Sequence, residues 1–162
     1  MNSTGNPNHI NVFGHHKEVK AIVSLGTKDF GQKGWKLTAH KYYDKDKRDE
    51  YSTKVCCHKE KKECQVWKFQ KEGSHWRIQL LDDAYHEKGS YLTAHRYYDQ
   101  KDKRDDSSTF VFLHKEKKEG QLFDIHPAGN GLYRITLATD DYGQRGWALT
   151  AHRYYENDKR DD

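Results

Sequence analysis

The side chains most suited to chemistry in this chain are histidine, tyrosine, aspartate and arginine groups that recur three times in one order. Each copy reads Leu-Thr-Ala-His-Lys/Arg-Tyr-Tyr and continues into a loop with Asp-Lys-Arg-Asp, and the copies span residues 37–50, 92–106 and 149–162. The second copy follows the first by 55 residues, and the third follows the second by 57. A repeat of about 56 residues predicts an array of similar structural units that present the same polar groups.

The repeated polar groups are suited to binding a hydroxyl-rich ligand such as a sugar. Carboxylates, histidine and arginine hydrogen-bond to vicinal hydroxyls, and an aromatic ring stacks on the apolar face of a pyranose. Because side chains alternate along a strand, Leu37 and Ala39 are expected on the core face, and Thr38 and His40 on the outer face. We therefore expect three equivalent sites. Their expected ligands are His40, Tyr42, Asp46, Asp49, His95, Tyr97, Asp102, Asp105, His152, Tyr154, Asp158 and Asp161.

The strand after each loop adds a second histidine and a glutamate to the expected sites. These residues are His58, Glu60, His114 and Glu116. The third copy is not followed by such a strand, so His16 and Glu18 from the other end of the chain are expected to supply the equivalent groups. Recent duplication is the alternative explanation for matching copies, although the segments between the loops have diverged more than the loops themselves.

The elements that position these groups are predicted to be strands of one all-β domain. A chain of 162 residues is long enough for a single domain with a core, and 13% aromatic residues with only 2 prolines suit buried strands. No segment has apolar residues at helical spacing. Strands are expected at residues 10–13, 21–25, 35–40, 53–59, 65–69, 76–81, 90–98, 108–115, 121–125, 133–138 and 147–155.

Three units of four strands account for this pattern. The expected units are residues 10–51, 52–106 and 107–162 of a single domain that spans residues 1–162. Eleven strands are recognised where three such units require twelve. We therefore expect residues 10–18 to complete the third unit, and a chain cut short at its C-terminus is the alternative.

Two of the units carry a Gln-x-aromatic sequence, at Gln65-Val66-Trp67 and at Gln121-Leu122-Phe123. Together with three four-stranded units, this motif resembles the β-trefoil superfamily, which includes ricin-type lectins, fascins and hisactophilins. The resemblance covers nearly the whole chain and implies a β-trefoil with pseudo-threefold symmetry. It identifies a fold more closely than an activity, because one fold hosts many functions.

The order of the histidines is similar to that in the mussel-type galactose-binding lectins, in which His-Pro-x-Gly-Gly precedes His-x-Asp-x-His. The similarity places the first histidine on His40, His95 and His152, and the second on His58 and His114, with glutamate replacing the aspartate. The Pro-x-Gly-Gly stretch is Lys/Arg-Tyr-Tyr here. The resemblance implies a lectin for galactose or N-acetylgalactosamine with up to three shallow sites and no cofactor, whose useful strength comes from multivalent binding to glycans.

A cytoskeletal function is the alternative that the resemblance leaves open. Fascins and hisactophilins are trefoil proteins that bind actin, and 11 histidines would make binding to acidic actin filaments dependent on pH. Such binding normally needs charge of one sign on one face, whereas lysine and arginine here alternate with aspartate and glutamate. A homodimer is also left open.

Composition argues against several other functions. The net charge of +4 is spread over basic runs that carry their own acids, which is not typical of nucleic-acid binding. No apolar run approaches the roughly 18 residues of a membrane span and the first residues lack a signal-peptide pattern, so we expect a cytoplasmic protein or one secreted without a signal peptide.

Catalysis and metal binding are not expected. The chain has no nucleophile motif, phosphate-binding glycine loop or His-Glu-x-x-His sequence. Cys56, Cys57 and Cys64 lie close to His58, but they lack the paired spacing of a zinc site and are too few and too clustered for a disulfide framework.

Overall fold

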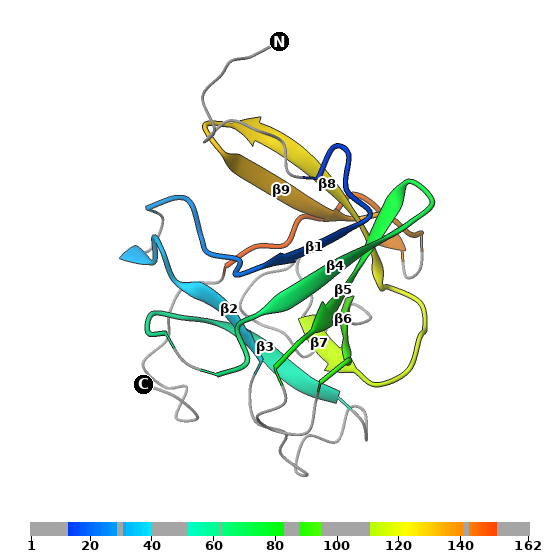
Figure 1. The fold of residues 1–162 in the computed structure, drawn as a ribbon, viewed down its shortest axis with the longest axis horizontal. Coiled ribbons are helices and arrows are strands. Elements are labelled where there is room, and N and C mark those ends of the chain that lie inside the picture. The colour runs from blue at the N-terminus through cyan, green and yellow to red at the C-terminus, as the bar shows by residue number, and fades with distance from the viewer. Residues whose placement is uncertain are drawn as a thin grey trace.

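Figure 1 shows the computed structural model of the protein, which describes residues 13–28, 31–39, 52–61, 63–82, 88–94, 111–140 and 143–151. These residues form nine strands and no α-helix, so the predicted all-β class is confirmed. Within these ranges no helix is long and apolar enough to cross a membrane.

The strands are short, between four and eight residues, and they are separated by turns and charged loops. In chain order they are β1 (Glu18–Ala21), β2 (Lys36–Ala39), β3 (Ser52–His58), β4 (Trp67–Glu72), β5 (His75–Leu80), β6 (Tyr91–Ala94), β7 (Val111–His114), β8 (Leu122–Gly129) and β9 (Leu132–Leu137).

All nine strands belong to one sheet in which the described pairs are antiparallel. The sheet runs β1-β4-β5-β6-β7-β3-β2, and β8 pairs with both β5 and β9. Figure 1 shows β4 and β5 crossing the middle of the molecule, with the β8–β9 hairpin on one side and β2, β3 and β7 on the other. Strands from different parts of the chain therefore lie side by side.

The sheet repeats its own register along the chain. β1 pairs with β4 so that Ala21 lies opposite Trp67, and β5 pairs with β8 so that Trp76 lies opposite Phe123. The β4–β5 and β8–β9 hairpins also correspond residue by residue near their open ends. Strands with repeated sequences thus occupy repeated positions in the sheet.

One turn occurs three times with the same geometry. Its glycine has a φ of 86° or 87°, a left-handed conformation that favours glycine over residues with a Cβ atom. In each copy the glycine amide donates to a leucine carbonyl at 2.8 Å. The three pairs are Gly34 with Leu25, Gly89 with Leu80, and Gly146 with Leu137.

The core is built from the inward positions of β4 and β5. Every second residue is buried along the whole of β5 and along the first four residues of β4, as the predicted alternation requires. Burying each large apolar side chain contributes about 1.5–3 kcal/mol. Trp67 also satisfies its indole nitrogen, which donates to the Leu37 carbonyl at 3.0 Å. The most deeply buried large apolar residues are Trp67, Phe69, Ile78, Leu80, Leu92, Phe112 and Leu113.

An aromatic cluster closes the core beside β9. The ring of Phe13 lies 5.2 Å from that of Phe69, 5.3 Å from that of Trp76 and 5.1 Å from that of Tyr133, each in edge-on geometry. Such contacts add to the area that the rings bury. The segment before β1 is thereby anchored to β4, β5 and β9.

The observed bounds differ from the predicted ones at several strands, such as 65–69 against Trp67–Glu72 and 121–125 against Leu122–Gly129. Two predicted strands differ more. In place of the strand expected at residues 21–25, β1 covers Glu18–Ala21, where it pairs with β4. Beyond Ala21, Ser24 forms only an isolated bridge with Lys36. The strand expected at residues 147–155 is, as far as residue 151, a single bridge between Ala148 and Thr136.

Candidate functional site

Two hairpins carry loops in which many of the expected ligands lie. The β2–β3 hairpin places Ala39 opposite Val55, and the β6–β7 hairpin places Ala94 opposite Val111 at the equivalent point of the repeat. β3 also pairs with β7, so the two hairpins are neighbours in the sheet. The loops at residues 40–51 and 95–110 therefore begin from matching stems.

A buried glutamine fastens each hairpin to the turn that follows it. In the first unit, Gln65 Nε2 donates to Thr38 Oγ1 at 3.1 Å and to the backbone carbonyl of Glu60 at 2.8 Å. The Thr38 hydroxyl donates in turn to the Lys36 carbonyl at 2.7 Å. The Gln65 side chain is buried, so losing these bonds would leave polar atoms unpaired away from water.

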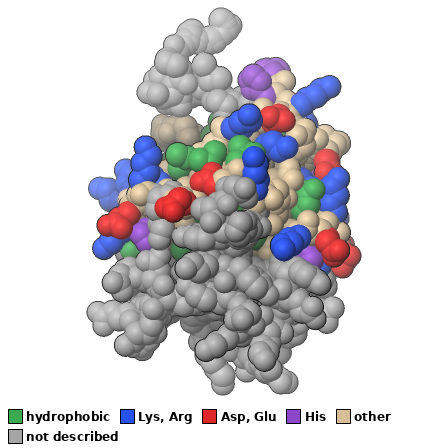
Figure 2. Space-filling view, turned by 60° about the horizontal axis from the view of Figure 1, so that its bottom comes forward, with side chains coloured by type: hydrophobic (Ala, Val, Ile, Leu, Met, Phe, Trp, Pro, Cys, Tyr) green, Lys and Arg blue, Asp and Glu red, His purple; other side chains and the backbone are tan. Residues whose placement is uncertain are grey.

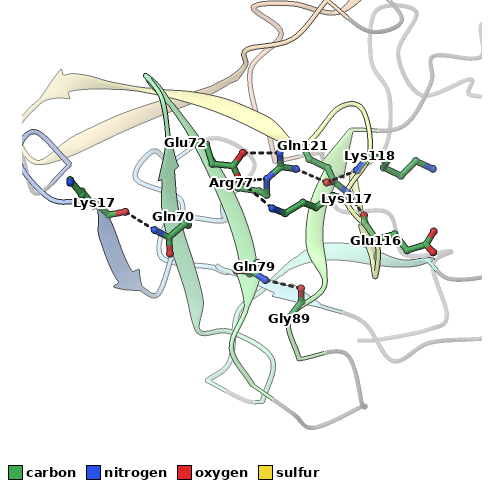
Figure 3. A network of polar contacts seen from close by, with 10 residues as sticks. All are labelled: Lys17, Gln70, Glu72, Arg77, Gln79, Gly89, Glu116, Lys117, Lys118 and Gln121. Atoms are coloured by element: carbon green, nitrogen blue, oxygen red, sulfur yellow. Dashed lines mark hydrogen bonds and ion pairs between the residues drawn. The ribbon is translucent and has the colours of Figure 1, made fainter.

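The second unit repeats this arrangement around Gln121. Its Nε2 donates to Thr93 Oγ1 at 3.1 Å and to the Glu116 carbonyl at 2.9 Å. Its Oε1 accepts from the Lys118 amide at 2.9 Å and from Arg77 Nη1 at 2.8 Å, as Figure 3 shows. We call this arrangement of a buried glutamine, a threonine hydroxyl and a turn carbonyl the glutamine clamp.

Arg77 connects the second clamp to the β4–β5 hairpin (Figure 3). Its Nε and Nη2 donate to the two carboxylate oxygens of Glu72 at 2.5 and 3.0 Å. The hydrogen bond from Arg77 lowers the pKa of Glu72 below its ordinary value, and the charges of Arg77 and Lys117 act in the same direction against the effect of burial. Glu72 is therefore ionised at neutral pH.

Histidines His58 and His114, expected as sugar ligands, are only 8% and 5% exposed. The Nδ1 atom of each accepts a hydrogen bond at 3.1 Å from the backbone amide two residues later, that of Glu60 or Glu116. An accepting Nδ1 places the proton of the neutral ring on Nε2. These histidines cap the turn, whereas the side chains of Glu60 and Glu116 are exposed.

Thr38, which was expected on the face opposite the core, is buried. Thr38 and its counterpart Thr93 are 3% and 6% exposed. The reason is the glutamine clamp, which folds the following turn over the outer face of β2 and β6. Strand alternation holds, but both faces of these strands are covered at Thr38 and Thr93. Alternation alone therefore does not show that the next residue is exposed.

The third copy is described only as far as residue 151. The Leu149 amide donates to the Ile135 carbonyl at 2.7 Å, which places this copy beside β9. The Thr150 hydroxyl donates to the Ala148 carbonyl at 2.8 Å, as the clamped threonines do to their own strands. Unlike them, Thr150 is exposed.

The groups expected to complete the third site are exposed near the start of the described chain. His16 lies in the segment before β1, and Glu18 begins β1 opposite Gln70 of β4. In the part of the chain that the structure describes, neither residue forms a hydrogen bond or ion pair with residues 143–151. Their assignment to the third site stays a prediction.

The remaining expected ligands fall outside the described residues. They are His40, Tyr42, Asp46, Asp49, His95, Tyr97, Asp102, Asp105, His152, Tyr154, Asp158 and Asp161.

The cysteines form no disulfide. Burial raises the pKa of the Cys57 thiol, which keeps it protonated and weakly nucleophilic at neutral pH. Cys64 is fully buried in the core. Among the described side chains, no group of three histidine, cysteine, aspartate or glutamate residues is arranged to hold a metal ion.

The Gln-x-aromatic motif was used in the sequence analysis only as a sign of the fold, and its role in shaping the candidate site was missed. The available signal was the constant interval of five residues from Glu60 to Gln65 and from Glu116 to Gln121. The sequence signal for Arg77 was partial, because Arg134 occupies the corresponding place in the third unit but Ile22 occupies it in the first.

The visible surface mixes both signs of charge. Figure 2 shows lysine and arginine side chains interspersed with aspartate and glutamate over the described part of one face. This distribution agrees with the interleaved charges of the sequence.

No protein-family model, curated protein or solved structure matches the chain. The function is therefore inferred from the geometry and chemistry of the chain itself.

Proposed function

We propose that the protein is a β-trefoil lectin that binds galactose- or N-acetylgalactosamine-type glycans without catalysing a reaction. Its sugar-binding groups are the histidine, tyrosine and aspartate residues of the repeated loops. Each loop forms one shallow site, and up to three sites act together on a glycan-coated surface, so that individually weak contacts give useful avidity.

The observation that carries the proposal is the matching support of the first two loops. The glutamine clamps at Gln65 and Gln121 hold the same atoms at nearly the same distances. A fixed stem lowers the entropy that a loop loses when it binds a ligand. Loops that share their polar sequence and their support are suited to binding the same ligand.

The geometry favours different roles for the two kinds of predicted ligand. His58 and His114 are buried with Nδ1 engaged, which suits residues that position the site. Glu60 and Glu116 have fixed backbones and exposed carboxylates, which suits direct hydrogen bonds to sugar hydroxyls. In this proposal, the loop histidines and tyrosines complete the contact.

The test is a glycan array probed with the wild-type chain and with the double variant His95→Ala/His152→Ala. Loss of binding in the double variant with an unchanged unfolding curve is the expected result. The matched control is His126→Ala, which removes an exposed histidine of β8 outside the repeated loops and is expected to bind like the wild type.

Silence of the folded wild-type protein on the array would refute the lectin proposal. If the same protein then cosediments with actin filaments, the cytoskeletal alternative is supported. Equal loss of binding in His126→Ala would also refute the assignment to the loops.

A further inference from the structure

A row of four polar side chains crosses the outer face of four neighbouring strands. Lys20 of β1 lies opposite Lys68 of β4, which lies opposite Gln79 of β5, which in turn lies opposite Tyr91 of β6. Directly opposed residues of antiparallel strands point to the same face of a sheet. With strands about 4.8 Å apart, the row is about 14 Å long, comparable to a short oligosaccharide.

The two lysines of the row are like charges in direct opposition. No described group forms an ion pair or hydrogen bond with either ammonium. On the same face, Glu72 lies four residues along β4 from Lys68 and is bound by Arg77. Glu18 lies two residues along β1 from Lys20 and forms no ion pair with it among the described residues. Like charges opposed across strands destabilise a sheet, so an anion placed between them is favoured.

The corresponding row in the next repeat has two side chains that attract each other at the positions of the lysines. There His75 and Asp124 replace the two lysines, and His75 Nδ1 lies 2.7 Å from Asp124 Oδ1. Thr136 and Ala148 continue that row. An attractive pair at one copy and a repulsive pair at the other indicates that the Lys20–Lys68 pair has a use beyond holding the strands together.

We propose that the row Lys20–Lys68–Gln79–Tyr91 binds an acidic saccharide. The sulfate or carboxylate of the ligand lies between the two ammonium groups, and its sugar ring extends over Gln79 toward Tyr91. This site is separate from the repeated loops and does not depend on them.

The neutral half of the row is arranged for a sugar. Gln79 Nε2 donates to the Gly89 carbonyl at 3.0 Å, which fixes the amide and leaves Oε1 to accept from a hydroxyl. Arg77 Cζ lies 5.6 Å from the centre of the Tyr91 ring and steadies it. An amide oxygen and a phenol beside two cations suit a charged sugar better than a nucleic acid, whose backbone needs a longer run of cations.

The test compares lactose with 3′-sulfolactose, two sugars that differ by one sulfate, in titrations of the full chain. Lys20→Gln/Lys68→Gln removes both charges of the row. The control Lys59→Gln/Lys61→Gln removes the same charge from exposed lysines after β3. We expect the wild type and the control to prefer 3′-sulfolactose by about tenfold or more and the row variant to lose this preference. Sodium chloride is expected to weaken the preference.

Several outcomes would overturn the proposal. The proposal fails if the wild type does not prefer 3′-sulfolactose to lactose, or if the control variant loses this preference as fully as the row variant does. It also fails if sulfate or hexaglutamate binds the wild type as tightly as 3′-sulfolactose does. The row variant is expected to unfold at the same temperature as the wild type or higher, because the repulsion is gone, and a lower temperature would make the lysines structural. His95→Ala should keep the preference, so failure of the loop sites and failure of this row are distinguishable.

Discussion

Replacing Gln121 with alanine tests whether the glutamine clamp holds the candidate site in shape. The substitution removes four hydrogen bonds: two donated by Nε2 and two accepted by Oε1. Neutral bonds contribute about 1 kcal/mol each, and the bond from Arg77 about 1.5–3 kcal/mol because its donor is charged. Since the bonds are not additive, we expect a loss of about 3–5 kcal/mol in the free energy of unfolding.

Gln65→Ala is the matched comparison, because Gln65 occupies the same place in the first unit. Its Nε2 bonds are the same, but Ile22 stands where the second unit has Arg77. The expected loss is about 2–3 kcal/mol, so the difference between the two variants reports the charged bond. A double-mutant cycle with Arg77→Met should recover most of that difference as coupling between Arg77 and Gln121.

Urea unfolding followed by tryptophan fluorescence measures these values, because Trp67 and Trp76 are buried in the folded chain. A loss below about 1 kcal/mol for Gln121→Ala would refute the reasoning, since it would mean that the buried amide contributes no more than a single exposed bond. Equal losses for the two glutamines with no coupling to Arg77 would refute the role given to Arg77.

Three further predictions concern other parts of the fold. Gly120→Ala should lower the free energy of unfolding by about 1–3 kcal/mol, because the glycine has a φ of 76° and a Cβ atom there would lie 2.9 Å from the Ala94 carbonyl oxygen; an unchanged urea midpoint would contradict this. Glu72→Gln should flatten the pH dependence of stability. Arg77 lowers the pKa of Glu72 in the folded protein, so the Glu72–Arg77 ion pair stabilises the protein above the unfolded pKa of about 4.3. This stabilisation is lost as the pH falls through the folded pKa. Because the Glu72 side chain is 36% exposed, the variant should differ from the wild type by less than about 1 kcal/mol at pH 7 and by a smaller amount at pH 2. An equal difference at both pH values in urea titrations would disprove the linkage. Phe13→Ala removes a ring that contacts three other aromatic rings and should cost about 2–4 kcal/mol by thermal unfolding, whereas a shift of less than a degree would show that the segment before β1 does not stabilise the core.

The sequence predicted the all-β class and most strands because alternating apolar residues directly reflect burial in a sheet. Trp67, Phe69, Ile78 and Leu80 alternate with polar residues and are buried as expected. The bounds of β1 could not be predicted in this way, since they depend on how far the β4–β5 hairpin extends and pairs with it.

The exposure of site residues was harder to predict, because a neighbouring segment can cover either face of a strand. Thr38 was expected on the outer face of its strand and is buried under the turn that Gln65 holds. His58, which was expected to be a ligand, is 8% exposed and accepts a bond from a backbone amide of its own turn. Both outcomes depend on contacts between residues distant in sequence or on local turn geometry, neither of which residue type and spacing reveal.

The most direct test of the lectin proposal is the number of sugar sites in the wild type and in His95→Ala. Titration of each protein with N-acetylgalactosamine, followed by NMR, gives both the number of sites and their dissociation constants. Independent loops on matching stems predict that His95→Ala loses one site while the dissociation constants of the others stay unchanged. Absence of any site in the wild type, or a uniform weakening of all sites in the variant, would contradict the proposal.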